Sequence, residues 1–311
     1  MLSVKNLIDT YSLTADDITQ ILDTAASFES VNNRAIKKVP ALRGRTIVNL
    51  FLEPYTRTKS SFELAEKRLS ADSLSMGGST SSVVKGESLA DTIQTISAMN
   101  VDMFVCRAKL AGTPQRITEN TDAVVINAGD GKHQHPTQAM LDLYTIRKNF
   151  GHLDGLKVAI VGDLAHSRVC GSLAPALKTM GAEVTLVGPP TFQVDDPDWF
   201  GCPQTASLDD VIEDMDVVYM LRVQLERMEG AAIPSRREYN RLYGLDMTRV
   251  NRMKPGAIIC HPGPMNRGME INADVADCAR SRILNQVNAG VLTRMAEMYL
   301  LLGGENNGLS A

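Results

Sequence analysis

The chain has 311 residues, of which 44% are hydrophobic and 22% are charged. This length suits two ordinary domains or one large one, and this composition is typical of a soluble globular protein. The formal net charge of −4 gives no sign of a nucleic-acid or membrane surface. The longest apolar runs are far too short to span a bilayer. The five cysteines are widely spaced without a C-x-x-C pair, so we expect free thiols in a reducing cytoplasm rather than disulfides or a zinc site.

Short apolar runs rich in β-branched residues alternate with amphipathic helical stretches in both halves of the chain. In the first half we expect strands at 46–51, 101–106 and 123–127, with a weaker one at 73–76. In the second half we expect strands at 158–161, 184–187, 217–220 and 257–259. Such alternation predicts an α/β protein with two doubly wound domains, built on mainly parallel sheets and joined by interdomain helices.

The helical patterns also suggest where the domains divide. We expect one domain over 1–134, a bridging helix over 135–150 and a second domain over 151–286, with Gly151 and Gly155 at the boundary. We expect the last apolar pattern, 287–303, to pack back on the first domain. In open α/β sheets ligands bind beyond the carboxyl ends of the strands, so the informative residues should follow the strands.

The segment after the first strand combines hydroxyl groups and a cation at a helix start. Thr56, Arg57 and Thr58 offer hydroxyls, backbone N–H groups and a bidentate guanidinium, which suits a phosphate site. A Thr-capped helix with a surface arginine is the alternative. Further along, the polar loop 79–92 carries Ser81 and Lys85 and either folds over an anion or is simply a solvated loop.

Two more candidates follow the next strands of the first half. Arg107 comes directly after the run 101–106, where an arginine is usually just solvated. His135 precedes Pro136, a residue that suits a first helical turn, so the imidazole should sit at a helix N-terminus and favour its neutral form. There it could polarise a carbonyl group or act as a plain cap. A metal site formed by His133 and His135 is a further alternative, although no third ligand is evident.

In the second half, basic and amide side chains again follow the strands. The segment after 158–161 lacks the G-x-G-x-x-G pattern of dinucleotide-binding folds and carries Arg168 instead. Arg222 and Gln224 follow 217–220 and share one side of an extended chain. The turn after 257–259 is stiffened by prolines at 262 and 264. Together the two halves predict an interdomain site for a phosphate-bearing molecule and a dianion.

In chain order and spacing these motifs resemble those of aspartate carbamoyltransferase catalytic chains, over roughly residues 13–302. The motifs that carry the resemblance are Thr56-Arg57-Thr58, Lys85-Gly86-Glu87-Ser88-Leu89, His135-Pro136-Thr137-Gln138, Arg222-Val223-Gln224-x-Glu226-Arg227 and His261-Pro262-x-Pro264. Ornithine-specific relatives typically carry a cysteine in the motif that matches 135–138 and a His-Cys-Leu-Pro motif late in the chain. Thr137 and Pro262-Gly263-Pro264 therefore favour aspartate.

The resemblance implies transfer of the carbamoyl group from carbamoyl phosphate to L-aspartate, a step of pyrimidine biosynthesis, with a carbamoyl phosphate-binding domain at 1–134 and an aspartate-binding domain at 151–286. The implied contacts to carbamoyl phosphate are Thr56, Arg57, Thr58, Ser81, Arg107, His135, Gln138, Gly263 and Pro264. The implied contacts to aspartate are Lys85, Arg168, Arg222 and Gln224. The implied catalytic residues are Arg57, Thr58, Lys85, Arg107 and His135.

The resemblance also implies a cytoplasmic homotrimer with shared active sites, to which Ser81 and Lys85 come from a neighbouring subunit. It implies no metal and no organic cofactor, and it allows regulatory or dihydroorotase-like partner chains. Two positions depart from the pattern, since Tyr55 stands where a serine is usual and Lys59 where an arginine is frequent. Two alternatives therefore stay open: a carbamoyltransferase for another amine, and a catalytically weak structural or regulatory homologue.

Overall fold

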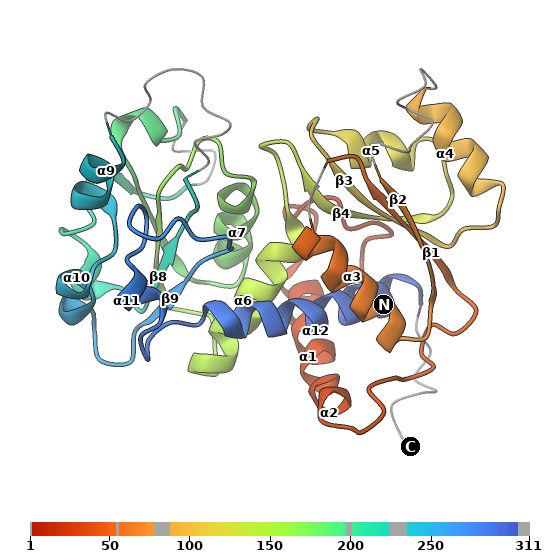
Figure 1. Cartoon of the computed structure of the whole chain (residues 1–311), viewed down its shortest axis with the longest axis horizontal. Coiled ribbons are helices and arrows are strands. Elements are labelled where there is room, and N and C mark those ends of the chain that lie inside the picture. Colours follow the sequence, from red (N-terminus) through yellow and green to blue (C-terminus); the bar gives the residue numbers. More distant parts are fainter. Residues whose placement is uncertain (1, 54–55, 78–87, 197–200, 224–234, 304–311) are drawn as a thin grey trace. The chain divides into compact units, whose positions relative to one another are not determined.

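The computed structural model describes residues 2–53, 56–77, 88–196, 201–223 and 235–303. The chain forms two compact units, unit 1 with Met1–Tyr144 and Asn288–Ala311, and unit 2 with Thr145–Val287. Each unit is built on its own sheet (Figure 1). The division falls inside the helix α6 (Pro136–Phe150), which begins one residue after the start of the helix expected at 135–150.

Unit 1 contains a four-stranded sheet in which all neighbouring strands are parallel. Its strands are β1 (Thr46–Phe51), β2 (Asp72–Gly77), β3 (Met103–Ala108) and β4 (Val124–Asp130). Their order is β2-β1-β3-β4. The chain therefore proceeds outward from the centre in both directions, and the β1/β3 junction is the switch point of a doubly wound sheet.

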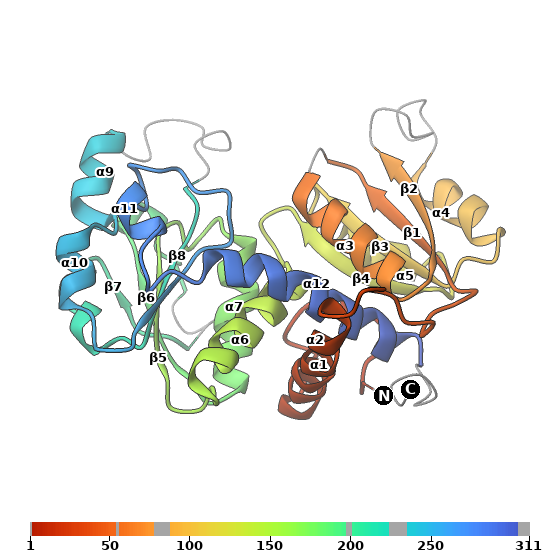
Figure 2. The ribbon, with the colours of Figure 1, turned by 60° about the horizontal axis from the view of Figure 1, so that its bottom comes forward.

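Helices cover both faces of this sheet. On one face, α4 (Leu89–Ser97) and α5 (Thr113–Thr118) pack against an apolar cluster from β1, β3 and β4. On the other face, α3 (Thr56–Arg68) is attached by a buried hydrogen bond of 2.8 Å from Asn49 Nδ2 to Glu66 Oε1. Figure 2 shows α3 lying across this sheet.

The C-terminal helix α12 (Ile283–Leu301) returns to unit 1, which includes the chain from Asn288 onward. Arg294 donates a 2.6 Å hydrogen bond to Ser61 of α3 and stacks over the Phe62 ring. The Tyr299 ring meets the edge of Phe28, which lies between α1 (Ala15–Ser27) and α2 (Glu29–Asn32). The end of α12 is thus part of the unit that contains α3.

Unit 2 contains a five-stranded parallel sheet. Its strands are β5 (Lys157–Val161), β6 (Glu183–Val187), β7 (Gln204–Thr205), β8 (Val217–Met220) and β9 (Ile258–Cys260), in the order β7-β6-β5-β8-β9. Here the switch point lies between β5 and β8. The helix α7 (Arg168–Thr179) packs beside β6. The apolar cluster on one face of the sheet joins β5, β8 and β9 to α10 (Met247–Arg252), α11 (Ala273–Ala276) and the short helix η3 (Ile212–Asp214).

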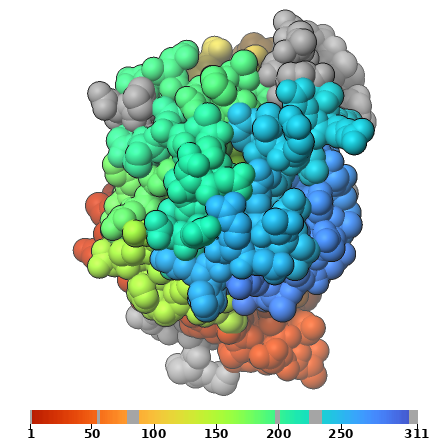
Figure 3. All heavy atoms as spheres, turned by 90° about the vertical axis from the view of Figure 1, so that its left-hand side faces the viewer, coloured from red at the N-terminus to blue at the C-terminus, as the bar shows by residue number. Residues whose placement is uncertain are grey.

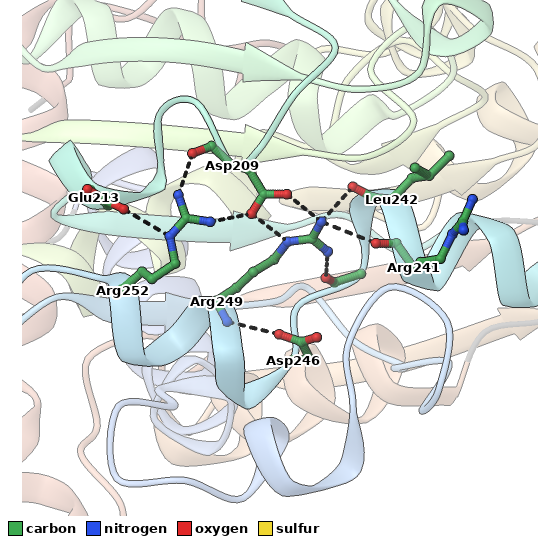
Figure 4. Close-up of polar contacts among 8 residues, drawn as sticks. Asp209, Glu213, Arg241, Leu242, Asp246, Arg249 and Arg252 are labelled. Atoms are coloured by element: carbon green, nitrogen blue, oxygen red, sulfur yellow. Dashed lines mark hydrogen bonds and ion pairs between the residues drawn. The ribbon is translucent and has the colours of Figure 1, made fainter.

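A group of charged residues ties the outer elements of unit 2 together. Arg249 of α10 donates two hydrogen bonds to Asp209, of 3.1 and 2.7 Å. It also donates to the carbonyl groups of Leu242 and Gly244, where α9 (Arg236–Tyr243) ends (Figure 4). Arg252 bridges Asp209 and Glu213. On the surface of unit 2, the teal segment around 210 adjoins the blue segment that includes α10 (Figure 3).

The predicted fold class is confirmed, since both sheets are doubly wound and every strand pair is parallel. The bounds 46–51 and 217–220 also agree with the structure, and the helix expected at 135–150 begins one residue later, at Pro136. The other expected strands differ from the structure by one to three residues at their ends. β3 is shifted by two residues to Met103–Ala108, so Arg107 lies within the strand rather than after it, and β4 runs on to Asp130. α12 begins at Ile283, ahead of the apolar pattern, and the short edge strand β7 was not expected.

All five cysteines lie in the described part of the chain, and all are free thiols. Burial raises the pKa of Cys106 and of Cys170, so these thiols are unreactive core groups. Within the described residues, no helix combines the length and apolar character that crossing a membrane requires.

Candidate active site

In unit 1 the candidate site lies at the carboxyl ends of β1 and β3, the switch point of the sheet. The chain leaves β1 through Leu52 and Glu53, and α3 begins at Thr56. Arg107 lies in the neighbouring strand β3, paired with Phe51 of β1. These groups come from neighbouring strands whose polar ends meet at one edge, where ligands of open α/β sheets bind.

Arg107 is a buried cation fixed by several partners. Its side chain is 3% exposed. Its Nε donates to Glu53 Oε1 at 2.8 Å, and its Nη1 donates to the carbonyl oxygen of Ala128 at 3.0 Å. The same Nη1 lies 3.4 Å from Thr58 Oγ1. A guanidinium fixed in this way can contact a ligand without first losing conformational freedom.

The start of α3 brings two of the predicted residues into this region. Thr58 is buried and lies next to Arg107, whereas the Arg57 side chain is exposed on the same helix turn. Thr56 is the first residue of the helix. A helix N-terminus favours an anion through its unpaired N–H groups and its dipole.

The loop between β4 and α6 is fixed by a buried carboxylate that the motifs did not single out. Asp130 Oδ1 accepts hydrogen bonds from Asn127 Nδ2 at 2.8 Å and from the Gln134 N–H at 3.1 Å. Asp130 Oδ2 accepts from the Gly112 N–H at 2.7 Å and lies 3.1 Å from His133 Nδ1. Asp130 thereby connects the loop after β3 to the residues directly before His135.

His135 and Gln138 lie at the start of α6, as expected. His135 is buried directly before the first residue of the helix, and its Nδ1 lies 3.5 Å from Thr137 Oγ1. Gln138 Nε2 donates to Asp142 Oδ1 at 3.0 Å, one helical turn further on. The His133 ring faces Asp130, and within the described residues no cluster of three or more His, Cys, Asp or Glu side chains is arranged to hold a metal ion.

In unit 2 the candidate residues follow the two central strands. After β5, Ser167 caps α7 by accepting the Cys170 N–H, and Arg168 is the first helical residue, with its side chain buried. After β8, Arg222 is half-buried next to the buried Val223. β5 and β8 are hydrogen-bonded neighbours, so the two arginines follow adjacent strands at the switch point of this sheet.

The turn after β9 contains Gly263 and Pro264. Gly263 has a φ of 59°, a conformation that glycine adopts without steric cost, and its peptide bond to Pro264 is cis. β9 neighbours β8, so this turn leaves the sheet beside the segment that carries Arg222.

Four predicted site positions lie outside the described residues: Tyr55, Ser81, Lys85 and Gln224. The structure also identifies two polar residues that the motifs had not assigned, Glu53 and Asp130. Both carboxylates stand where an expected strand gives way to a polar segment, Glu53 just after β1 and Asp130 at the last residue of β4, and this is the available sequence signal. Their roles depend on partners such as Arg107 and Gly112, 54 and 18 residues away in the sequence, which the motif alone does not specify.

Two families of domain match nearly the whole chain. Residues 5–148 match "Aspartate/ornithine carbamoyltransferase, carbamoyl-P binding domain", and residues 154–301 match "Aspartate/ornithine carbamoyltransferase, Asp/Orn binding domain". The chain is 54% identical over 301 residues to the aspartate carbamoyltransferase catalytic subunit of Thermobifida fusca, covering 97% of this chain and 96% of that protein. It is also 54% identical over 306 residues to the catalytic subunit from Salinispora arenicola, covering 97% and 99%.

Solved structures agree with the sequence relatives. The catalytic subunit of M. jannaschii aspartate transcarbamoylase has a TM-score of 0.85 at 35% identity, covering 98% of this chain and 100% of that chain. Aspartate transcarbamoylase from Trypanosoma cruzi, in complex with N-(phosphonacetyl)-L-aspartic acid, has a TM-score of 0.87 at 29% identity, covering 96% of both chains. Ornithine carbamoyltransferase from Pyrococcus furiosus has a TM-score of 0.87 at 27% identity, covering 97% and 98%, so the fold alone does not distinguish the two amine substrates.

Proposed function

Because the chain belongs to the aspartate/ornithine carbamoyltransferase family, we propose that it transfers the carbamoyl group of carbamoyl phosphate to the amino group of L-aspartate. The products are N-carbamoyl-L-aspartate and phosphate, and the reaction belongs to pyrimidine biosynthesis. The observation that carries this conclusion is the 54% identity to an aspartate carbamoyltransferase catalytic subunit over nearly the whole chain. Similarity of fold extends to an ornithine enzyme as well, so the substrate assignment depends on sequence.

We assign the binding of carbamoyl phosphate chiefly to unit 1. The start of α3 would hold the phosphate through Thr56, Arg57 and Thr58, since a helix N-terminus with hydroxyl groups and a guanidinium binds a dianion well. Ser81 and Lys85 of a neighbouring subunit would complete the phosphate site. Gln138, with the turn at 263–264, would orient the carbamoyl NH₂ group.

The chemical step requires stabilisation of a developing oxyanion. The aspartate amine attacks the carbonyl carbon and the carbonyl π electrons move to oxygen. Collapse of that intermediate breaks the bond to phosphate, and the departing phosphate takes the proton that the amine loses. Arg107, Thr58 and His135 would donate hydrogen bonds to this oxygen. Each such preorganised donor is worth ~3 kcal/mol in the transition state. The anchoring of Arg107 by Glu53 and Ala128 supports its role as a fixed donor. This chemistry requires no cofactor.

We assign the binding of aspartate to unit 2 together with Lys85. Arg168 would hold the α-carboxylate, and Arg222 and Gln224 would hold the β-carboxylate. Bidentate pairing between guanidinium and carboxylate accounts for a preference for a dicarboxylic amine, because a cationic side chain such as that of ornithine would be repelled there.

The domain roles follow the same division, with carbamoyl phosphate binding at 1–134 and aspartate binding at 151–286. The bridging segment would be 135–150, and 287–303 would pack on the first domain, a division supported by the inclusion of the chain from Asn288 onward in unit 1. We further propose a cytoplasmic homotrimer with active sites shared between subunits, to which regulatory or dihydroorotase-like chains could bind.

A colorimetric ureido assay tests the function directly. Purified protein is incubated with carbamoyl phosphate and either L-aspartate or L-ornithine, and the carbamoylated product is measured. Product is expected with aspartate and not with ornithine. Turnover with ornithine alone would indicate a carbamoyltransferase for another amine, and no turnover with either amine would indicate a catalytically weak homologue in which Tyr55 replaces the usual serine.

A further inference from the structure

A buried imidazole follows β9, outside the substrate contacts assigned above. The His261 side chain is 1% exposed. Its Nδ1 accepts a hydrogen bond from the Gly263 N–H at 2.8 Å, and its Nε2 lies 3.1 Å from Glu270 Oε1. Because Nδ1 acts as an acceptor, the single proton of the neutral ring must be on Nε2, where it is donated to Glu270.

Glu270 closes the same turn from the other side. Its side chain is fully buried, and Oε1 accepts both the His261 proton and the backbone N–H of Asn266, the latter at 2.5 Å. Two backbone N–H groups of the turn, those of Gly263 and Asn266, are therefore held by one His–Glu pair.

The network continues to the segment that follows β8. The Asn266 side-chain amide donates a 2.9 Å hydrogen bond to the carbonyl oxygen of Val223. Val223 is buried directly after Arg222. A continuous path of hydrogen bonds thus leads from Gly263, through His261, Glu270 and Asn266, to the residue next to Arg222.

We propose that His261, Glu270 and Asn266 are positioning residues that set the turn at 262–264 and the segment at 222–223 in one fixed relation. This rests on the proposed function, in which the turn orients the carbamoyl NH₂ group and Arg222 holds the aspartate β-carboxylate. This hydrogen-bond network would thereby align carbamoyl phosphate, the electrophile, with the amino group of aspartate.

The chemistry of the turn explains why it needs such support. Its proposed ligand contacts are backbone groups, whose directions depend on chain conformation and not on a side-chain rotamer. The acceptor Nδ1 of His261 binds the N–H two residues ahead, the same connection that an asparagine side chain makes in an Asx turn. Displacement of reacting groups by about 1 Å costs on the order of 100-fold in rate, so a loosened turn should be visible in kinetics.

Two variants separate the two ends of the network. His261→Ala releases the Gly263 N–H and is expected to lower kcat/KM for carbamoyl phosphate by about 10-fold or more, the value of a lost hydrogen bond of ~1.4 kcal/mol. Asn266→Ala releases Val223 and is expected to raise the KM for aspartate by about 5-fold while the KM for carbamoyl phosphate stays within about 2-fold. His261→Asn is expected to recover most of the loss, because its amide oxygen can accept the Gly263 N–H.

The matched control is Asn240→Ala. The Asn240 amide likewise donates to a backbone carbonyl in this part of unit 2, that of Met269 at 2.9 Å, and contacts Asn272, but neither bond reaches the two functional segments. The Asn240→Ala variant should lower the melting temperature about as much as Asn266→Ala does. The KM values for carbamoyl phosphate and for aspartate should both stay within about 2-fold of wild type.

The experiment measures steady-state kinetics with each substrate varied in turn, together with thermal unfolding, for wild type and all four variants. An equal rise of both KM values in His261→Ala and Asn266→Ala, matched by Asn240→Ala at the same loss of melting temperature, would mean that the network only stabilises unit 2, and would overturn the inference. A wild type that carbamoylates neither aspartate nor ornithine would overturn the proposed function, and the inference with it, so the two failures are distinguishable.

A second comparison applies if His261→Ala does not fold. His261→Asn retains the acceptor for Gly263, whereas His261→Gln extends towards Glu270 and leaves the Gly263 N–H without its acceptor. The inference requires the Asn variant to have the lower KM for carbamoyl phosphate, and an equal or reversed order would refute it.

Discussion

The buried carboxyl group of Glu297 in α12 leads to a quantitative prediction about stability. Its side chain is 0% exposed, and neither oxygen has a hydrogen-bond partner within the described residues. Burial raises its pKa from 4.5 to about 8, against an opposing effect of Arg294. At neutral pH this group is therefore protonated in the folded chain and ionised in the unfolded chain.

The sign and size of the effect follow from this difference. A carboxyl group with a raised folded pKa contributes stability that is fully present below the unfolded value of 4.5 and is lost as the pH rises through about 8. The interval of roughly 3.5 pH units corresponds to about 5 kcal/mol at ~1.4 kcal/mol per unit. Between about pH 5 and pH 8, integration gives a loss of roughly 3.5 kcal/mol.

Glu297→Gln provides the test, because glutamine has nearly the same shape and does not ionise. Urea unfolding of wild type and variant is measured at about pH 5 and pH 8, and the wild type is expected to lose roughly 3 kcal/mol more than the variant over this range. Glu183→Gln is the control, since Glu183 is exposed on β6, and its pH dependence should follow that of wild type. If wild type and Glu297→Gln differ by the same amount at both pH values, Glu297 does not titrate as a buried acid and the reasoning is wrong.

Four further predictions concern the substrates, the assembly and unit 2. Arg222→Ala should abolish most aspartate binding and turnover while calorimetry shows carbamoyl phosphate binding nearly unchanged; equal loss of both would refute the assignment of Arg222. Lys85→Ala and His135→Ala should each be nearly inactive. Trimers reassembled from a mixture of the two variants should recover activity, because some shared sites then combine an intact His135 with an intact Lys85 from the neighbouring subunit. No recovery in verified mixed trimers would mean that Lys85 acts within its own chain. Tyr55→Ser should tighten carbamoyl phosphate binding by about 10-fold, the value of one hydrogen bond to a charged group, with a smaller change in kcat; unchanged or weaker binding would show that Tyr55 makes a useful contact of its own. Arg249→Met should lower the free energy of unfolding by at least about 2 kcal/mol, and an unchanged urea midpoint would contradict the role of Arg249 in joining α9 to α10.

The sequence predicted the layered architecture well because the signals for it are local. Strand 217–220 is a short β-rich apolar run, and helix 136–150 begins at a proline suited to a first helical turn. Where the prediction failed, the local signal was weak or misleading. The run 101–106 is apolar apart from Asp102. Hydrogen bonding to β1 and β4 places the strand at Met103–Ala108, which excludes Asp102 and includes Arg107. β7 is only a two-residue edge strand and has no periodicity to detect.

The candidate site was predicted as a set of residue types and was completed only by tertiary contacts. A threonine–arginine–threonine segment at a helix start indicates an anion site from its chemistry alone. The same segment does not indicate that Arg107 would be buried beside Thr58, because those residues are 49 positions apart. Strand order decides this contact, since β1 and β3 are neighbours although β2 lies between them in the sequence.

By itself, the sequence determined the element types, the α/β class and the ordered motifs that relate the chain to carbamoyltransferases, because periodicity and motif chemistry act over a few residues. Only the tertiary structure decided which groups support those motifs. Glu53 holds Arg107 from 54 positions away, and Asn266 reaches Val223 across 43. Such pairs form because a parallel sheet brings the carboxyl ends of separate strands to one edge, and a buried polar group there must find a partner among whatever the fold brings near it.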